Sequence, residues 1–100
     1  MNPLEKQRIN FKPMPHIELL KALDHLKAGA YKAGPQMEAA HEIAQSNEGD
    51  PLYDWLHAIV HRIEGDDRNA DYWYRRAGQH RHDGSVEEEW EILRSVFESD

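Results

Sequence analysis

The chain has no cysteine, and its 100 residues include no long apolar run. Without cysteine it can form neither disulfides nor thiolate metal sites, and this absence is typical of the cytoplasmic location that we expect. The apolar runs are a few residues long, whereas a helix that spans a bilayer needs roughly 20, so we expect no membrane partner. The first fifteen residues also lack the apolar core of a signal peptide.

Positive charge is scarce in most of the chain, whose net charge is −7. Residues 1–32 hold six basic and three acidic side chains, whereas residues 33–100 hold six basic and sixteen acidic ones. Affinity for nucleic acids depends mainly on Lys and Arg side chains that neutralise phosphates, so we expect no nucleic-acid partner. With 39% hydrophobic and 31% charged residues, the composition indicates one small globular domain without a deep enclosed cavity.

Glycine and proline divide the chain into an arm and about five short helices. Three prolines predict an extended arm over residues 1–14, followed by one all-α domain over residues 15–100. The predicted helices run from about Pro15 to Ala28, from Pro35 to a stop near residues 47–49, from Pro51 to Gly65, from residue 66 or 67 to Gly78, and from residue 86 to Phe97. Short connections predict antiparallel neighbours, hence stacked helical hairpins, and no segment alternates as a strand would.

Several helix ends carry clear local signals. Gly29 suits the left-handed position after the first helix, and Asp50 suits the N-cap of the third. Ser85 and Glu88 have the spacing of a capping box, and the acidic run 87–89 favours the positive end of the last helix. We therefore expect the last helix to begin at this box.

Polar side chains line one face of the second predicted helix and one face of the third. The second helix carries Glu38, His41 and Gln45, and the third carries Asp54, His57, His61 and Glu64, opposite an apolar face of Leu52, Leu56, Ile59 and Ile63. A tight turn near Gly49 would place His41 level with His57, because each lies eight residues from the turn. The same turn would place Glu38 level with His61, and Gln45 level with Asp54.

Three interpretations of these polar faces stay open. The first is a zinc or iron site that uses His41, His57 and His61 with Glu38 or Glu64, since His-x-x-x-His places two imidazoles one helical turn apart. The second is a groove for a peptide or a small anionic ligand. The third is an ordinary solvated or hydrogen-bonded helix face, because acid–histidine pairs at these spacings stabilise helices slightly.

The fourth predicted helix carries three consecutive aromatic residues, Tyr72, Trp73 and Tyr74. Consecutive helical residues point about 100° apart, so we expect Trp73 and Tyr74 in the core and Tyr72 towards a neighbour or a ligand. Arg76 follows Tyr72 by one turn. A Tyr–Arg edge can bind carboxylates, phosphates or a protein, so we include both residues in the candidate ligand groove.

Nothing in the sequence specifies a reaction. The serines lie near helix ends outside any nucleophile motif, and cysteine is absent. A pair such as His57 and Asp54 could exchange protons, but no nucleophile accompanies it. We therefore do not expect an enzyme unless a metal is bound.

The spacing Gly65-Asp66-x-x-x-Ala70-x-x-x-Tyr74-x-x-Ala77 resembles the second half of a tetratricopeptide or Sel1-like repeat. Ala58 stands where these repeats have a small residue in their first helix. Met37, His41 and Ala44 repeat the spacing weakly 33 residues earlier. The resemblance covers about half the chain, and it implies a helical interaction module. Asp54, His57 and His61 depart from the family's pattern, which argues against its usual peptide groove.

A second pattern, H-x-x-x-H-R-x-E-G-D-x-x-N-x-x-Y-W over residues 57–73, resembles a family of small helical proteins without an assigned function. The leading hypothesis from the sequence is a small helical binding or interaction module with a histidine-lined groove. The alternative is a metal-binding protein or metal-dependent enzyme. Two repeats are fewer than the three that a free-standing solenoid needs, so a homodimer is also a hypothesis.

Overall fold

The computed structural model describes residues 15–99, which form five α-helices and no β-strand, as the sequence predicts. The helices are α2 (Pro15–Ala28), α3 (Pro35–Gln45), α4 (Pro51–Glu64), α5 (Asp67–Ala77) and α6 (Val86–Ser99). None of them combines the length and the apolar character needed to cross a membrane. The arm predicted over residues 1–14 lies outside the described residues.

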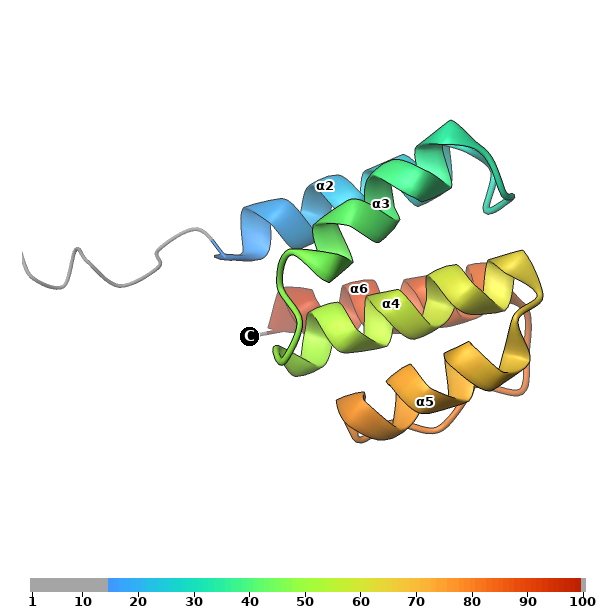
Figure 1. Cartoon of the computed structure of the whole chain (residues 1–100). Coiled ribbons are helices and arrows are strands. Elements are labelled where there is room, and N and C mark those ends of the chain that lie inside the picture. The colour runs from blue at the N-terminus through green and yellow to red at the C-terminus, as the bar shows by residue number, and fades with distance from the viewer. Residues whose placement is uncertain (1–14, 100) are drawn as a thin grey trace, which may run out of the picture.

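The helices pack as two antiparallel hairpins with α6 behind them (Figure 1). α2 pairs with α3, α4 pairs with α5, and α4 lies between α3 and α5. α6 runs antiparallel to α4 and contacts both α4 and α2. The predicted antiparallel neighbours are therefore confirmed. Stacking in the manner of a tetratricopeptide array stays a prediction.

Most helix ends follow the local signals in the sequence. The Asp50 carboxylate accepts a hydrogen bond from the N–H of Leu52 at 2.9 Å and caps α4, which ends at Gly65 with a left-handed φ of 85°. At the start of α6, the N–H of Ser85 donates to Glu88 Oε1 at 2.9 Å, and the N–H of Glu88 donates to Ser85 Oγ at 3.0 Å. This reciprocal pair is the predicted capping box.

The predicted left-handed position at Gly29 is wrong. Ala30 and Tyr31 adopt positive φ values of 57° and 59° instead, and the N–H of Tyr31 closes α2 by donating to the carbonyl of Leu26 at 2.9 Å. Gly29 is required for a different reason: a Cβ atom there would lie 2.8 Å from the Cβ of Gln36. The missing side chain thus lets the start of α3 approach the end of α2.

α4 is the central helix and is buried on nearly every side. Every residue from 53 to 61 is buried, including Asp54, His57 and His61. The sequence places these three polar residues opposite the apolar face of the helix. That periodicity cannot reveal that α3 and α5 pack over the polar side as well, as the structure shows. A helix enclosed in this way needs polar partners for its polar residues.

Glu89 is fully buried and joins α6 to the second hairpin. Its carboxylate accepts hydrogen bonds from Trp55 Nε1 at 2.9 Å, from the Tyr74 hydroxyl at 2.8 Å and from Arg62 Nη1 at 2.6 Å. Burial and the hydrogen bond to Glu89 both raise the pKa of Tyr74, so the phenol keeps its proton and remains a donor. The sequence indicates only a favourable interaction of Glu89 with the helix dipole and misses these partners.

Trp90 joins α6 to the first hairpin. Its indole N–H donates to the carbonyl of Leu23 at 2.9 Å, and the ring of Tyr31 meets it edge to face at 5.8 Å between centroids. The guanidinium of Arg94 lies 5.4 Å from the indole and 3.6 Å from Asp24. Trp90 and Glu89 together connect α6 to both hairpins.

Candidate metal centre: a cluster of three histidines

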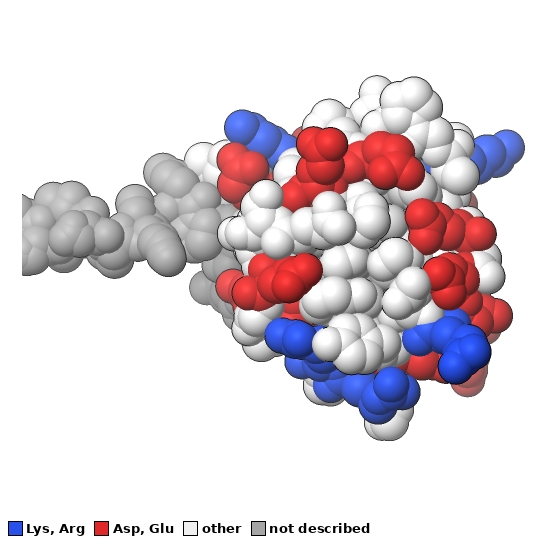
Figure 2. All heavy atoms as spheres, viewed as in Figure 1, with Lys and Arg blue, Asp and Glu red and all other residues white. Residues whose placement is uncertain are grey.

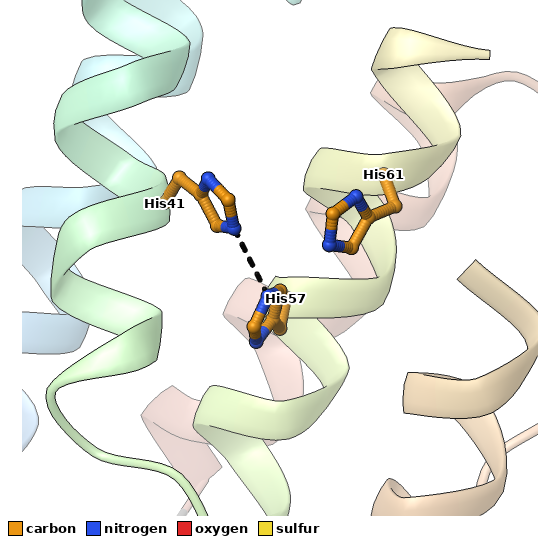
Figure 3. Close-up of side chains that lie close together, drawn as sticks. All are labelled: His41, His57 and His61. Carbon is orange, nitrogen blue, oxygen red and sulfur yellow. Dashed lines mark hydrogen bonds between the residues drawn. The ribbon is translucent and has the colours of Figure 1, made fainter. Parts of the chain in front are cut away.

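Three imidazoles converge between α3 and α4 (Figure 3). We call His41, His57 and His61 the histidine cluster. His41 Nε2 lies 3.0 Å from His57 Nε2, within hydrogen-bonding distance. One ring nitrogen from each histidine can be chosen so that all three lie within 4.8 Å of one another. The predicted turn near Gly49, which sets His41 level with His57, is therefore confirmed.

Carboxylates lie behind two of the three imidazoles. Glu64 Oε1 lies 2.8 Å from His61 Nδ1, and Glu38 Oε1 lies 3.9 Å from His41 Nδ1. Both carboxylates approach Nδ1, and in His41 the other nitrogen, Nε2, faces the cluster. The sequence predicts Glu38 at the same height as His61, but these two side chains do not pair. Glu38 lies against His41 of its own helix, and Glu64 lies against His61 of its own helix.

His57 lies at the centre of the cluster and is enclosed by aromatic rings. Its imidazole stacks on the indole of Trp73, with 3.9 Å between centroids and 16° between planes, and on the ring of His61 at 4.9 Å. The residue is 2% exposed. Burial, with smaller contributions from positive charge on His41 and His61, lowers the pKa of His57 to about 3. The ring is therefore neutral at pH 7 and keeps a lone pair for a ligand.

The Nδ1 atom of His57 is buried and has no hydrogen-bond partner among residues 15–99. If the proton sits on Nε2, His57 donates to His41 and leaves only a lone pair at Nδ1. The other tautomer leaves an N–H group without an acceptor, which costs about 1–3 kcal/mol. We therefore assign the proton to Nε2 in the metal-free protein on energetic grounds.

The other residues of the predicted groove lie away from the cluster. Gln45 is exposed, and the buried carboxylate of Asp54 accepts a hydrogen bond from the N–H of Gly49 at 3.1 Å. Asp54 therefore stabilises the turn between α3 and α4. Tyr72 is 44% exposed, and its hydroxyl accepts a hydrogen bond from Arg76 Nη1 at 3.2 Å, so these two residues form the predicted Tyr–Arg edge.

The Tyr–Arg edge is connected to the cluster through Trp73. The Arg76 guanidinium lies 5.1 Å from the indole that stacks on His57. Figure 2 shows acidic side chains over the upper and right parts of this face and basic ones along its lower edge, where α5 runs. The exposed arginines of α5 are Arg68, Arg75 and Arg76. Residues 15–99 enclose no pocket that would hold an organic ligand.

Comparison of the chain with protein-family models, with curated proteins and with solved structures gives no match. The two family resemblances noted in the sequence therefore stay predictions. Ala58, Ala70, Tyr74 and Ala77, the residues that carry the tetratricopeptide-like spacing, are all buried between helices.

Proposed function

We propose that the protein binds a divalent metal ion of the zinc class in the histidine cluster. The convergence of three ring nitrogens from two helices carries the proposal. Zinc bonds to histidine nitrogen at about 2.0–2.1 Å, so two nitrogens on one tetrahedral ion lie about 3.3 Å apart. His41 Nε2 and His57 Nε2 are already 3.0 Å apart. The third nitrogen, from His61, lies within 4.8 Å of the other two and would have to move closer to reach the same ion.

The carboxylates behind the imidazoles support the same function. A histidine that binds a metal commonly donates its second N–H to a carboxylate, which fixes the ring and makes the ligating nitrogen more basic. Glu64 occupies this place for His61, and Glu38 Oε1 lies 3.9 Å from the corresponding Nδ1 of His41. Their positions favour a metal-ligating role for Nε2 of both histidines.

The energetic cost of binding is modest by comparison. A metal at His57 Nε2 requires the ring proton to move to Nδ1, where residues 15–99 offer no acceptor. The stranded N–H costs about 1–3 kcal/mol, whereas structural zinc sites contribute about 10 kcal/mol or more to folding. The balance therefore favours the bound state even if this site is far weaker than a zinc finger.

The donor set favours zinc over iron. Non-haem iron is typically held by two histidines and a carboxylate, or by carboxylate-rich pairs of sites. Here the three converging donors are all imidazoles, and the nearby carboxylates lie behind His41 and His61. Neutral imidazoles suit the borderline character of Zn²⁺ and of its substitutes Co²⁺, Ni²⁺ and Cu²⁺.

Calorimetric titration of the full chain without an affinity tag tests the proposal. After dialysis against EDTA and then buffer, we expect one Zn²⁺ per chain and no binding of Mg²⁺. His41→Phe retains an aromatic ring but removes two nitrogens, and should weaken zinc binding at least tenfold. The matched control is His80→Gln, because His80 is exposed and outside the cluster.

Two results would contradict the zinc site. One is the absence of stoichiometric zinc binding by the wild type. The other is an equal loss of binding in His41→Phe and His80→Gln, which would indicate non-specific histidine binding. Circular dichroism of each variant shows whether the helices are retained.

A second proposed function is an interaction module that binds through the edge formed by Tyr72 and Arg76. Tyr72 is the most exposed aromatic side chain of α5, and Arg76 is ordered against it by a hydrogen bond and by cation–π contact at 5.8 Å. Aromatic residues and Arg are enriched in protein interfaces. Pull-down with Tyr72→Ala, compared with the surface control Glu91→Ala, tests it: equal capture by both variants excludes the edge.

A further inference from the structure

We propose that a metal ion in the histidine cluster keeps one coordination position open, and that this position binds a small anion. The proposal rests on the zinc site above and concerns the ligand that completes it. It follows from three observations: the surrounding carboxylates are engaged elsewhere, the side chains of His41 and His61 are partly exposed, and no pocket formed by residues 15–99 surrounds the cluster.

The carboxylates near the cluster already have other partners. Glu64 is bound to His61 Nδ1 at 2.8 Å. Asp66 caps α5 by accepting hydrogen bonds from the backbone and side chain of Asn69. Each of these roles would be lost if the carboxylate turned to the metal.

Glu38 lies beside the cluster with a longer contact, 3.9 Å from its Oε1 to His41 Nδ1. It approaches the edge of the imidazole away from His57, because His41 Nε2 is the atom that faces His57. A carboxylate behind a ligating ring supports that ring instead of binding the metal. The protein therefore supplies three imidazole donors, each of which binds a metal as the neutral ring.

The open side of the site lies towards solvent. Trp73 covers one face of His57, whereas the side chains of His41 and His61 remain 17% and 11% exposed. A divalent ion on three neutral imidazoles retains its full charge of two, which favours an anion as the fourth ligand. The guanidinium of Arg76, 5.1 Å from the Trp73 indole, adds positive charge on the α5 side.

The size of this fourth ligand is limited. The described residues leave no pocket beside the cluster, so an organic substrate would have no contact surface there. Water, hydroxide or a compact anion can reach the ion past the exposed edges of His41 and His61. Zinc sites with three protein ligands and one exchangeable position are the kind that activate bound water.

Cobalt substitution gives a direct test on the full chain. Co²⁺ in place of Zn²⁺ has visible absorption bands that depend on its ligands, so the titration uses Co²⁺-loaded protein and sodium azide as the anion. We expect a saturable spectral change with one azide per cobalt. Glu38→Gln, once loaded with cobalt, should still bind one azide per cobalt, because Glu38 does not fill the fourth position.

The possible outcomes separate the two proposals. If the chain gives no protein-bound cobalt spectrum, and no zinc binding either, the metal site itself is wrong. If cobalt binds but azide changes nothing, the site is closed and the open position is wrong. If azide changes the cobalt spectrum of Glu38→Gln but not that of the wild type, Glu38 is the fourth ligand. This result also contradicts the proposed open position.

Discussion

The imidazole of His57 lies nearly parallel to the indole of Trp73, with ring centroids 3.9 Å apart. This stack joins α4 to α5 at the point where His41 of α3 also reaches the same imidazole, 3.0 Å away from Nε2 to Nε2. One buried histidine thus contacts side chains from the helices on both sides of it. Its protonation state should therefore affect the packing of three helices.

The low pKa of His57 predicts that the free energy of unfolding decreases in mild acid. Its pKa is about 3 in the folded protein and near 6.5 in the unfolded chain. Between these values the unfolded chain binds the extra proton, so the contribution of His57 is complete above about pH 6.5 and falls as the pH drops towards 3. We expect a loss of up to about 2 kcal/mol between pH 7 and pH 5.

Urea denaturation at a series of pH values in metal-free buffer measures this loss. His57→Phe keeps an aromatic ring on Trp73 and should remove most of the pH dependence over this range. The control His80→Gln, at an exposed position, should keep the wild-type slope. An unchanged slope in His57→Phe would show that other groups cause the acid sensitivity.

Replacement of Trp73 should raise the pKa of His57. In Trp73→Leu the indole that covers one face of the imidazole is lost, so water approaches the ring and the desolvation that depresses the pKa decreases. NMR titration of the imidazole ¹H–¹³C signals should show the midpoint moving from about 3 towards 6.5. Tyr72→Ala is the control; a shift of similar size there would refute the role of the stack.

Loss of the buried Glu89 carboxylate should strongly destabilise the protein. Glu89→Ala removes three hydrogen bonds and leaves the Arg62 guanidinium without its buried counter-ion. Breaking a buried ion pair on one side costs about 3–5 kcal/mol. Chemical denaturation should show this loss, while Glu91→Ala, exposed on the same helix, should change stability by less than about 0.5 kcal/mol. Similar losses in both variants would contradict it.

The turn between α3 and α4 should depend on Gly49. Its φ of 99° is a conformation that side chains rarely adopt, although no atom would obstruct a Cβ there. Gly49→Ala should therefore cost about 1 kcal/mol through backbone strain alone. If the turn also aligns His41 with His57, zinc affinity should fall together with stability. Equal stability and affinity in Gly49→Ala would show that another conformation serves as well.

The sequence predicts the helices and part of the cluster because those features depend on local spacing. Asp50 and the Ser85–Glu88 box fix helix ends through contacts within three residues. The alignment of His41 with His57 across the hairpin follows because each lies eight residues from Gly49 in the sequence. These inferences need only helix geometry and a short connection.

Features that depend on distant contacts could not be predicted in this way. Glu89 meets Trp55 across 34 residues and Arg62 across 27. Its spacing from Val86 and Leu93 puts it on one face of α6 with them, but nothing local identifies the partners of its carboxylate. The same holds for the polar side of α4, which is enclosed because α5 folds back over it. Gly29 is the converse case: the local signal predicts a left-handed helix end, whereas close packing against Gln36 sets the requirement for glycine.

His41 and His57 are 16 residues apart in the chain, and an ion bound to both would close that segment into a loop. In a chain without cysteine, such an ion would act as a removable cross-link. By the chain-entropy argument used for disulfides, a loop of this length is worth about 3 kcal/mol. Chelation would then loosen the attachment of the first hairpin while Glu89 still held α6 to the second.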